Sequence, residues 1–162
     1  MTVTDVRKDT ESLTMTIACE YDAAPERVWQ LWADPRKLER WWGPPTYPAT
    51  VEEHDLRAGG TVRYFMTGPE GDKHAGGWRV LAVDPPHRLE VEDFFVGDDD
   101  QPDPDLPTTG MTVTISARAD GGAVMTITSS FASAEQLQQL LDMGVEEGMK
   151  AALGQTDALL AD

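Results

Sequence analysis

Basic residues are scarce in this sequence. Only 13 of its 162 residues are lysine or arginine, against 29 aspartates and glutamates, so the formal net charge at pH 7 is −16. Such a surface would repel a phosphate backbone or an anionic bilayer, which argues against nucleic acid and membranes as partners. We attribute the charge to solubility rather than to an acidic docking surface for a basic partner. The charge also predicts a monomer or a weak homodimer.

Cysteine and long apolar runs are nearly absent as well. Cys19 is the single cysteine, so no internal disulfide can form, in agreement with a reducing compartment. No apolar run approaches the roughly 18 residues of a membrane-spanning helix. The start of the chain carries Asp5, Lys8 and Glu11, where a signal peptide would have an apolar centre. We therefore expect a cytoplasmic protein whose residues 1–11 form a flexible N-terminus.

Signatures of catalysis and metal binding are missing too. The three histidines, His54, His74 and His87, have neither His-x-x-x-His spacing nor a Cys-x-x-Cys partner. No serine lies in a Gly-x-Ser-x-Gly elbow, and Cys19 occupies the apolar phase of an expected strand. The acidic segment 97–107 lacks the residue order of a calcium-binding loop. The sequence therefore predicts no catalytic residue, no metal and no cofactor.

The composition indicates one globular domain. Hydrophobic residues make up 40% of the chain and charged residues 26%, close to the average for globular proteins. A chain of 162 residues is also of a size that forms a single core. We expect one domain over residues 1–162, with residues 97–107 as a solvated acidic loop.

The first half of the chain predicts a strand, two short helices and further strands. Apolar and polar residues alternate over 13–21, which is the period of a half-buried strand. Pro25 suits the first turn of one short helix, and Leu38, Trp41 and Trp42 have helical spacing in a second. Five later segments rich in valine, threonine and aromatic residues, separated by turn signals, predict antiparallel strands.

The last thirty residues change to a helical period. Ser133 can cap a helix, and apolar residues then recur at steps of three and four without an intervening proline. This pattern predicts one long C-terminal helix, the only element long enough to cover the sheet. The expected fold is α+β, with a curved antiparallel sheet of about six or seven strands around that helix. Because one helix cannot fill a strongly curved sheet, a pocket should remain beside it.

Several spaced motifs resemble those of a known family. In chain order they are Trp41-Trp42-Gly43-Pro44, Asp55-Leu56-Arg57-Ala58-Gly59-Gly60, Gly76-Gly77-Trp78, Asp84-Pro85-Pro86-His87-Arg88-Leu89, and Met143-Gly144 with Glu147-Gly148-Met149. Over residues 13–160 the chain resembles the bacterial relatives of the activator of the 90-kDa heat-shock-protein ATPase, in the START-like (SRPBCC) superfamily. The resemblance implies the helix-grip fold and a cavity for a small hydrophobic molecule between sheet and terminal helix. None of the motifs is a catalytic signature.

The expected cavity wall combines aromatic, aliphatic and small residues. Its predicted members are Trp32, Trp41, Trp42, Phe65, Trp78, Asp93, Phe95, Met125, Leu141, Val145, Gly148 and Met149. The tryptophans could pack in the core or orient a ligand through their indole nitrogens. For Trp41 and Trp42 both interpretations stay open, because adjacent residues of a helix cannot both face the same core.

Asp93 and two glycines each allow two interpretations. Asp93 is in phase with Leu89 and Val91, so it faces either inward, as a carboxyl group in an apolar wall, or outward at a strand end. The outward orientation is favoured, since strand boundaries are poorly defined by sequence. Gly144 and Gly148, one helical turn apart, indicate close approach of strand and helix or, less favoured, room for a ligand.

Three functions are compatible with this pattern. The leading hypothesis is noncatalytic binding or transport of a small hydrophobic or amphipathic ligand. An enzyme of the cyclase or hydratase type would need acid–base groups such as Asp93, His54 or Arg63 to converge in the cavity. A chaperone-assisting module would instead expose an apolar patch on the convex face of the sheet.

Overall fold

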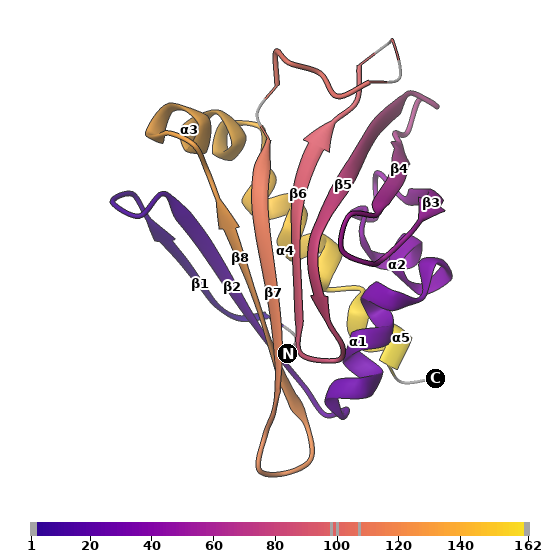
Figure 1. The fold of residues 1–162 in the computed structure, drawn as a ribbon, viewed down its shortest axis with the longest axis vertical. Helices are drawn as coiled ribbons and strands as arrows, with labels where there is room; N and C mark the ends of the chain where they lie inside the picture. Colours follow the sequence, from indigo (N-terminus) through magenta and orange to yellow (C-terminus); the bar gives the residue numbers. More distant parts are fainter. Residues whose placement is uncertain (1–2, 98, 100, 107, 161–162) are drawn as a thin grey trace.

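An eight-stranded antiparallel sheet curves around the helices in the computed structural model (Figure 1), which describes residues 3–97, 99, 101–106 and 108–160. The strand order across the sheet is β1-β2-β8-β7-β6-β5-β4-β3. The strands are β1 Val3–Asp9, β2 Thr14–Tyr21, β3 Ala49–His54, β4 Thr61–Thr67, β5 Lys73–Asp84, β6 Arg88–Phe95, β7 Thr109–Ala117 and β8 Ala123–Ser130. The predicted α+β fold class is confirmed, with more strands than the six or seven expected.

The strand that the sequence analysis missed is β1, which lies in the segment expected to be a flexible N-terminus. It pairs with β2 from Asp9↔Thr14 back to Val3. Within it, Val3 and Val6 pack against the core, and the other residues of the strand are exposed. Charged residues are typical of an edge strand, where they oppose pairing with a second chain. The charges that suggested flexibility therefore belong to an edge strand. Residues 1–2 lie outside the described residues.

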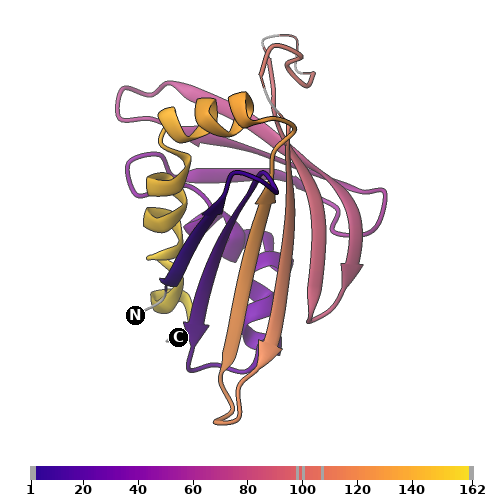
Figure 2. The ribbon, with the colours of Figure 1, turned by 90° about the vertical axis from the view of Figure 1, so that its left-hand side faces the viewer.

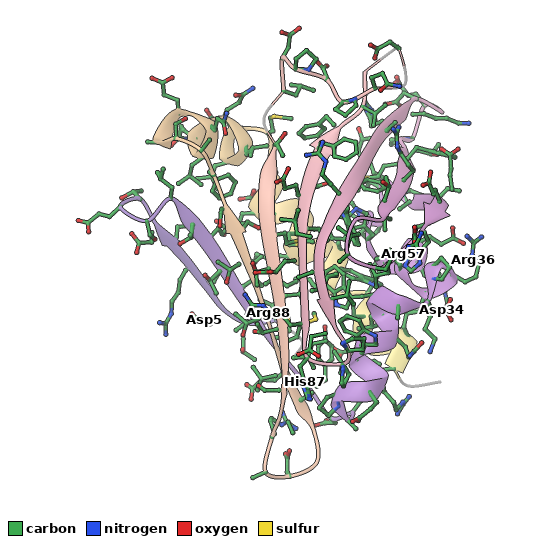
Figure 3. The ribbon with its side chains drawn as sticks, in the orientation of Figure 1. Asp5, Asp34, Arg36, Arg57, His87 and Arg88 are labelled. Carbon is green, nitrogen blue, oxygen red and sulfur yellow. The ribbon has the colours of Figure 1, made fainter. Side chains whose placement is uncertain are left out.

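Two short helices follow β2, as predicted. They are α1 Pro25–Ala33 and α2 Pro35–Trp41. Pro25 occupies the first turn of α1, where its missing N–H has no helical partner to lose. Asp34 caps α2, because its side chain accepts a hydrogen bond of 2.9 Å from the backbone N–H of Arg36 (Figure 3). Helix α2 packs against β3, which closes one end of the curved sheet.

The C-terminal segment forms three helices where one long helix was predicted. They are α3 Ala134–Asp142, α4 Val145–Leu153 and α5 Thr156–Leu160. Ser133 caps α3 as expected, accepting a hydrogen bond of 3.1 Å from the backbone N–H of Gln136. Gly144 separates α3 from α4 with a φ of +85°, a left-handed conformation that a right-handed helix cannot contain. The apolar period continues across this break, which is why the sequence predicted a single helix.

The core lies between the concave face of the sheet and these helices, which cross the open side of the sheet in Figure 2. One rung of the sheet shows how the two-residue period builds it. Ile17, Ile127, Val113 and Leu89 are successive register partners on β2, β8, β7 and β6, and all four are buried. Burial of each such side chain contributes about 1.5–3 kcal/mol, so the rung fixes the register of four strands.

A tryptophan cluster fills one end of the core, and consists of Trp32, Trp41, Trp42 and Trp78. The ring centroids of Trp32 and Trp41 lie 4.8 Å apart, and those of Trp42 and Trp78 lie 4.9 Å apart, in edge-to-face geometry. Each such pair adds about 0.5–1.5 kcal/mol beyond area burial. Trp41 and Trp42 were expected to diverge, but both rings reach the same cluster, with their centroids 5.6 Å apart.

Candidate functional site

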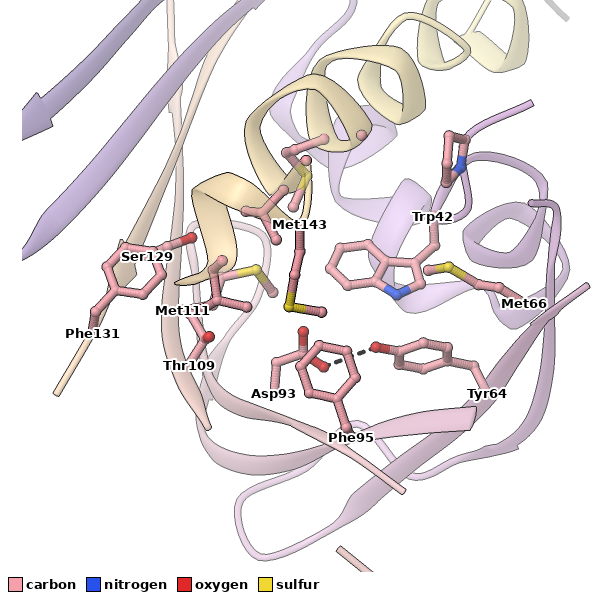
Figure 4. A pocket seen from close by; sticks show the side chains of 16 residues that line it. Trp42, Tyr64, Met66, Asp93, Phe95, Thr109, Met111, Ser129, Phe131 and Met143 are labelled. Carbon is pink, nitrogen blue, oxygen red and sulfur yellow. Dashed lines mark hydrogen bonds between the residues drawn. The ribbon is translucent and has the colours of Figure 1, made fainter. Parts of the chain in front are cut away.

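A cavity of about 280 Å³ lies between the concave face of the sheet and the helices α3 and α4 (Figure 4). Its lining residues are Trp42, Pro44, Tyr64, Met66, Asp93, Phe95, Thr109, Met111, Ser129, Phe131, Leu140, Met143, Gly144, Val145, Gly148 and Met149. Aromatic, aliphatic and thioether side chains form most of this surface. An apolar cavity with a few polar groups is the usual form of a small-molecule site.

The sheet side of the cavity follows from strand alternation. Residues two apart in a strand face the same side, so neighbouring strands each contribute inward-facing pairs. The pairs are Tyr64 and Met66 on β4, Asp93 and Phe95 on β6, and Thr109 and Met111 on β7. Ser129 on β8 and Phe131 just beyond it complete the wall. The sheet side of the cavity is therefore built mainly by the strands themselves.

Asp93 is the one carboxyl group among the described residues that line the cavity. Its Oδ1 accepts a hydrogen bond of 2.9 Å from the Tyr64 hydroxyl. Burial among apolar side chains raises the pKa of Asp93 to about 7, although the Tyr64 hydrogen bond opposes that rise. Burial, together with the charge of Asp93, also raises the pKa of Tyr64 well above its ordinary value. Asp93 thus faces inward, and the outward orientation favoured by the sequence analysis is wrong.

Trp42 brings the edge of the tryptophan cluster to this polar pair. Its side chain is only 5% exposed, and its Nε1 has no hydrogen-bond partner among the described residues. The indole N–H is directed toward Tyr64, without reaching hydrogen-bond geometry (Figure 4). A buried donor without a partner is costly. The wall around Asp93 therefore contains one polar group, the indole N–H of Trp42, that the described residues leave unpaired.

The helix side of the cavity is open at two glycines. A Cβ atom added to Gly148 would meet nothing within 4 Å, and the same holds for Gly144. Close approach of strand and helix, the favoured sequence interpretation, is therefore wrong at both positions. Gly144 is required by its positive φ, whereas Gly148 is an ordinary helical residue in α4 that leaves space in the cavity. Met143, which is 53% exposed, lies at the break between the helices and at the mouth of the cavity.

The structure brings together half of the predicted wall. The predicted residues that line the cavity are Trp42, Asp93, Phe95, Val145, Gly148 and Met149. Those that lie in the core, fully buried and away from it, are Trp32, Trp41, Trp78 and Met125. Leu141 packs against the core from α3, one residue beyond the lining residue Leu140. Phe65 is one residue out of phase on β4 and faces outward, where Lys73 Nζ lies 4.6 Å from its ring centroid.

Sequence reasoning missed several residues of the sheet wall. Tyr64, Met66, Met111, Ser129 and Phe131 were not predicted, although all of them line the cavity. The signal was present in β4, where the apolar phase runs through the buried Val62 and Tyr64. The choice of the aromatic Phe65 as a wall residue placed that strand in the opposite phase. For the polar Ser129, no pattern in the sequence distinguishes an inward from an outward orientation.

The acid–base groups of the enzyme hypothesis do not converge with Asp93. The His54 ring Nε2 lies 2.9 Å from the backbone oxygen of Trp32. The Arg63 guanidinium lies over the Phe94 ring, 5.8 Å from its centroid, on the side of β4 that faces away from the cavity. Tyr64 is thus the one titratable neighbour that Asp93 has among the described lining residues.

Neither a reactive thiol nor a metal site is found among the described residues. Cys19 is completely buried, and burial raises the pKa of its thiol to about 12, so no thiolate forms at neutral pH. Over the described residues, no group of three or more histidine, cysteine, aspartate or glutamate side chains could hold a metal ion. No helix in the described part of the chain is long and apolar enough to span a membrane. Leu81 on β5 and Met143 after α3 are the large hydrophobic side chains exposed there.

The curved sheet, the helices it grips and the apolar cavity between them define a protein of the START-like, helix-grip class. The chain belongs to the family of Activator of Hsp90 ATPase homolog 1-like proteins, whose family model matches residues 22–161. No curated protein matches the chain.

Solved structures of bacterial proteins have the same fold. The chain is similar to the crystal structure of protein Ms6760 from Mycobacterium smegmatis, with 52% identity, a TM-score of 0.89, and coverage of 98% of this chain and 96% of that one. It is also similar to a solution structure from Arthrobacter aurescens, with 46% identity, a TM-score of 0.94, and coverage of 99% and 92%. A crystal structure from Rhodobacter sphaeroides, 23% identical with a TM-score of 0.83 and coverage of 97% of both chains, shares the fold.

Proposed function

We propose that the protein binds a small hydrophobic or amphipathic molecule in the cavity and carries it without transforming it. The observation on which this rests is the cavity itself, about 280 Å³ of mainly apolar space between sheet and helices. An engineered apolar cavity of about 150 Å³ holds one benzene molecule. The cavity of this protein therefore suits a substituted aromatic ring or an alkyl chain of similar size.

The open space at Gly148 favours a ligand site over a defect in packing. Glycine in the interior of a helix costs about 1 kcal/mol relative to alanine, and alanine would meet no neighbouring atom here. Local stability therefore does not account for glycine at this position. The open space beside Gly148 is available to a bound molecule, and a side chain larger than that of alanine would fill it.

A carrier also fits the chemistry of the lining better than an enzyme. Asp93 and Tyr64 are hydrogen-bonded to each other, and the described lining residues include no histidine, lysine, cysteine or second carboxyl group that could activate the Thr109 or Ser129 hydroxyl. We further propose that the protein works in the cytoplasm, where the buried Cys19 stays reduced, as a monomer or weak homodimer without nucleic acid.

Filling the space at Gly148 tests the proposal. Gly148→Leu places a large side chain in the cavity, whereas Gly148→Ala, the matched control, adds one methyl group. We expect ethylbenzene to bind both the wild-type protein and the alanine variant. A titration monitored by nuclear magnetic resonance should show chemical-shift changes at residues that line the cavity. The leucine variant should bind at least about tenfold more weakly, since the site is occupied.

The free energies of unfolding of the same two variants distinguish an open cavity at Gly148 from a fully packed region. With a true cavity, both should fold at least as stably as the wild type, and alanine should gain up to about 1 kcal/mol. If the region were fully packed, Gly148→Leu would lose about 1–3 kcal/mol through overpacking. A destabilised leucine variant, together with a wild-type protein that does not bind ethylbenzene, would overturn the proposed function.

A further inference from the structure

The two carboxyl oxygens of Asp93 have different surroundings. Oδ1 accepts the hydrogen bond from Tyr64, at 2.9 Å. In Figure 4 the other oxygen is turned away from Tyr64, toward Met143 and the interior of the cavity. When the carboxyl group is protonated, its hydrogen belongs on this second oxygen, because Oδ1 is already an acceptor. The cavity wall then presents a single O–H donor to whatever molecule enters.

The described lining contains no positive charge to hold an anion. Arginine, lysine and histidine are all absent from the lining residues that the structure describes, and Asp93 is itself acidic. The whole chain also carries a net charge of −16, which opposes the approach of an anion. A carboxylate or phosphate placed beside Asp93 would be desolvated with no cation to compensate its charge, which costs several kcal/mol, and above pH 7 it would also lie next to a like charge. These conditions oppose the binding of fatty acids and phosphorylated molecules.

We infer that the cavity selects uncharged molecules in which one oxygen, of a ketone or an alcohol, accepts a hydrogen bond from Asp93 while the apolar remainder fills the space beneath α4. This inference rests on the proposed function and specifies its ligand class. Asp93 and the pair it forms with Tyr64 are the recognition group, and anions are rejected.

Asp93 should make the affinity for a ketone depend on pH. Tyr64 on β4 is the one titratable group facing Asp93 among the described residues, and the lining residues of α3, α4, β7 and β8 are uncharged. The pKa of Asp93 lies at about 7 because of burial. A ketone needs the protonated form, so its affinity should be full well below pH 7 and should fall as the pH rises through 7. The expected loss between pH 6 and pH 8 is about tenfold.

A matched series of small molecules tests this selectivity. Ethylbenzene, 1-phenylethanol, acetophenone, phenylacetate and 1-phenylethylammonium share one apolar skeleton and differ in the polar group. Titrations by nuclear magnetic resonance at pH 6 should give acetophenone and 1-phenylethanol dissociation constants several-fold below that of ethylbenzene. Phenylacetate should bind at least about tenfold more weakly than acetophenone.

Asp93→Asn is the matched variant for the pH dependence. Its amide keeps the shape and can donate a hydrogen bond at every pH, so the acetophenone affinity should become independent of pH between 6 and 8. The wild-type series needs no variant and stays decisive if the asparagine protein is unstable.

Three results would overturn the inference while leaving the proposed function intact. Phenylacetate could bind as well as acetophenone, or 1-phenylethylammonium could bind best and more tightly at higher pH. Acetophenone could also bind the wild-type protein equally at pH 6 and pH 8. In each case ethylbenzene would still bind in the cavity. Failure of every compound, ethylbenzene included, would instead remove the proposed function itself.

Discussion

The contribution of Asp93 to the free energy of unfolding depends on pH. The pKa of its carboxyl group is about 7 in the folded protein, raised by burial, against about 3.9 in an unfolded chain. The folded state therefore binds a proton more tightly than the unfolded state. Stability contributed at this site is present below pH 4, declines as the pH rises toward 7, and is constant above it.

Asp93→Asn should remove this pH dependence. Relative to the wild type, the variant should gain about 1–3 kcal/mol of unfolding free energy at pH 8 compared with pH 5, because an amide does not ionise. Urea denaturation of both proteins at the two pH values measures the difference, and the contributions of all other carboxyl groups cancel. Equal differences at both pH values would show that Asp93 is solvated in the folded state.

The residues of the site show where sequence reasoning succeeds. The phase of Leu89 and Val91 correctly indicated an inward Asp93, since the side-chain period of a strand is two, although the outward alternative was favoured. The same rule failed for Phe65, because an aromatic residue in a strand can face either side. A lining that draws on β4, β6, β7 and β8 is set by the register between strands, which single-strand patterns do not contain.

At the scale of elements, the acidic loop between β6 and β7 is separate from the core. Figures 1 and 2 show it projecting beyond the end of the sheet. Among its described residues, Asp103 donates a backbone hydrogen bond of 2.8 Å to the oxygen of Phe95, and Gly97 donates one of 2.9 Å to Gln101. Asp98, Asp100 and Pro107 lie outside the described residues.

Shortening this loop to a tight turn should preserve the fold. Closure entropy changes slowly with loop length, and the described residues of the loop are exposed or half-buried. We expect the melting temperature to stay within about 5 °C of the wild type, measured by circular dichroism. A fall of tens of degrees would indicate that the loop packs on the core.

The elements missed by sequence reasoning have a common cause. In β1 only Val3 and Val6 are half-buried, so the pattern that marks a strand was weak, and the pairing with β2 became visible only in the sheet. In the C-terminal segment, the apolar face continues from α3 to α4 although the chain breaks at Gly144. Both errors arise because hydrophobic periodicity reports burial, whereas backbone pairing and backbone φ are set by neighbours in space.

At the scale of the whole molecule, the surface charge governs association. Figure 3 shows charged side chains such as Asp5, Arg57 and Arg88 around the outside of the fold. With a net charge of −16, the protein should not shift duplex or single-stranded DNA in a gel at physiological salt. A dissociation constant below about 1 μM under those conditions would contradict this expectation, because even nonspecific binding requires a positive face.

The tryptophan cluster also gives the molecule an optical property. Trp32, Trp41, Trp42 and Trp78 have neighbouring ring centroids 4.8 Å to 6.0 Å apart, close enough for absorbed light energy to pass between the rings before emission. Trp42 is the member of the cluster that lines the cavity. A molecule that accepts energy from Trp42 would therefore dim the emission of the whole cluster, so the protein reports the occupancy of its own cavity without an attached label.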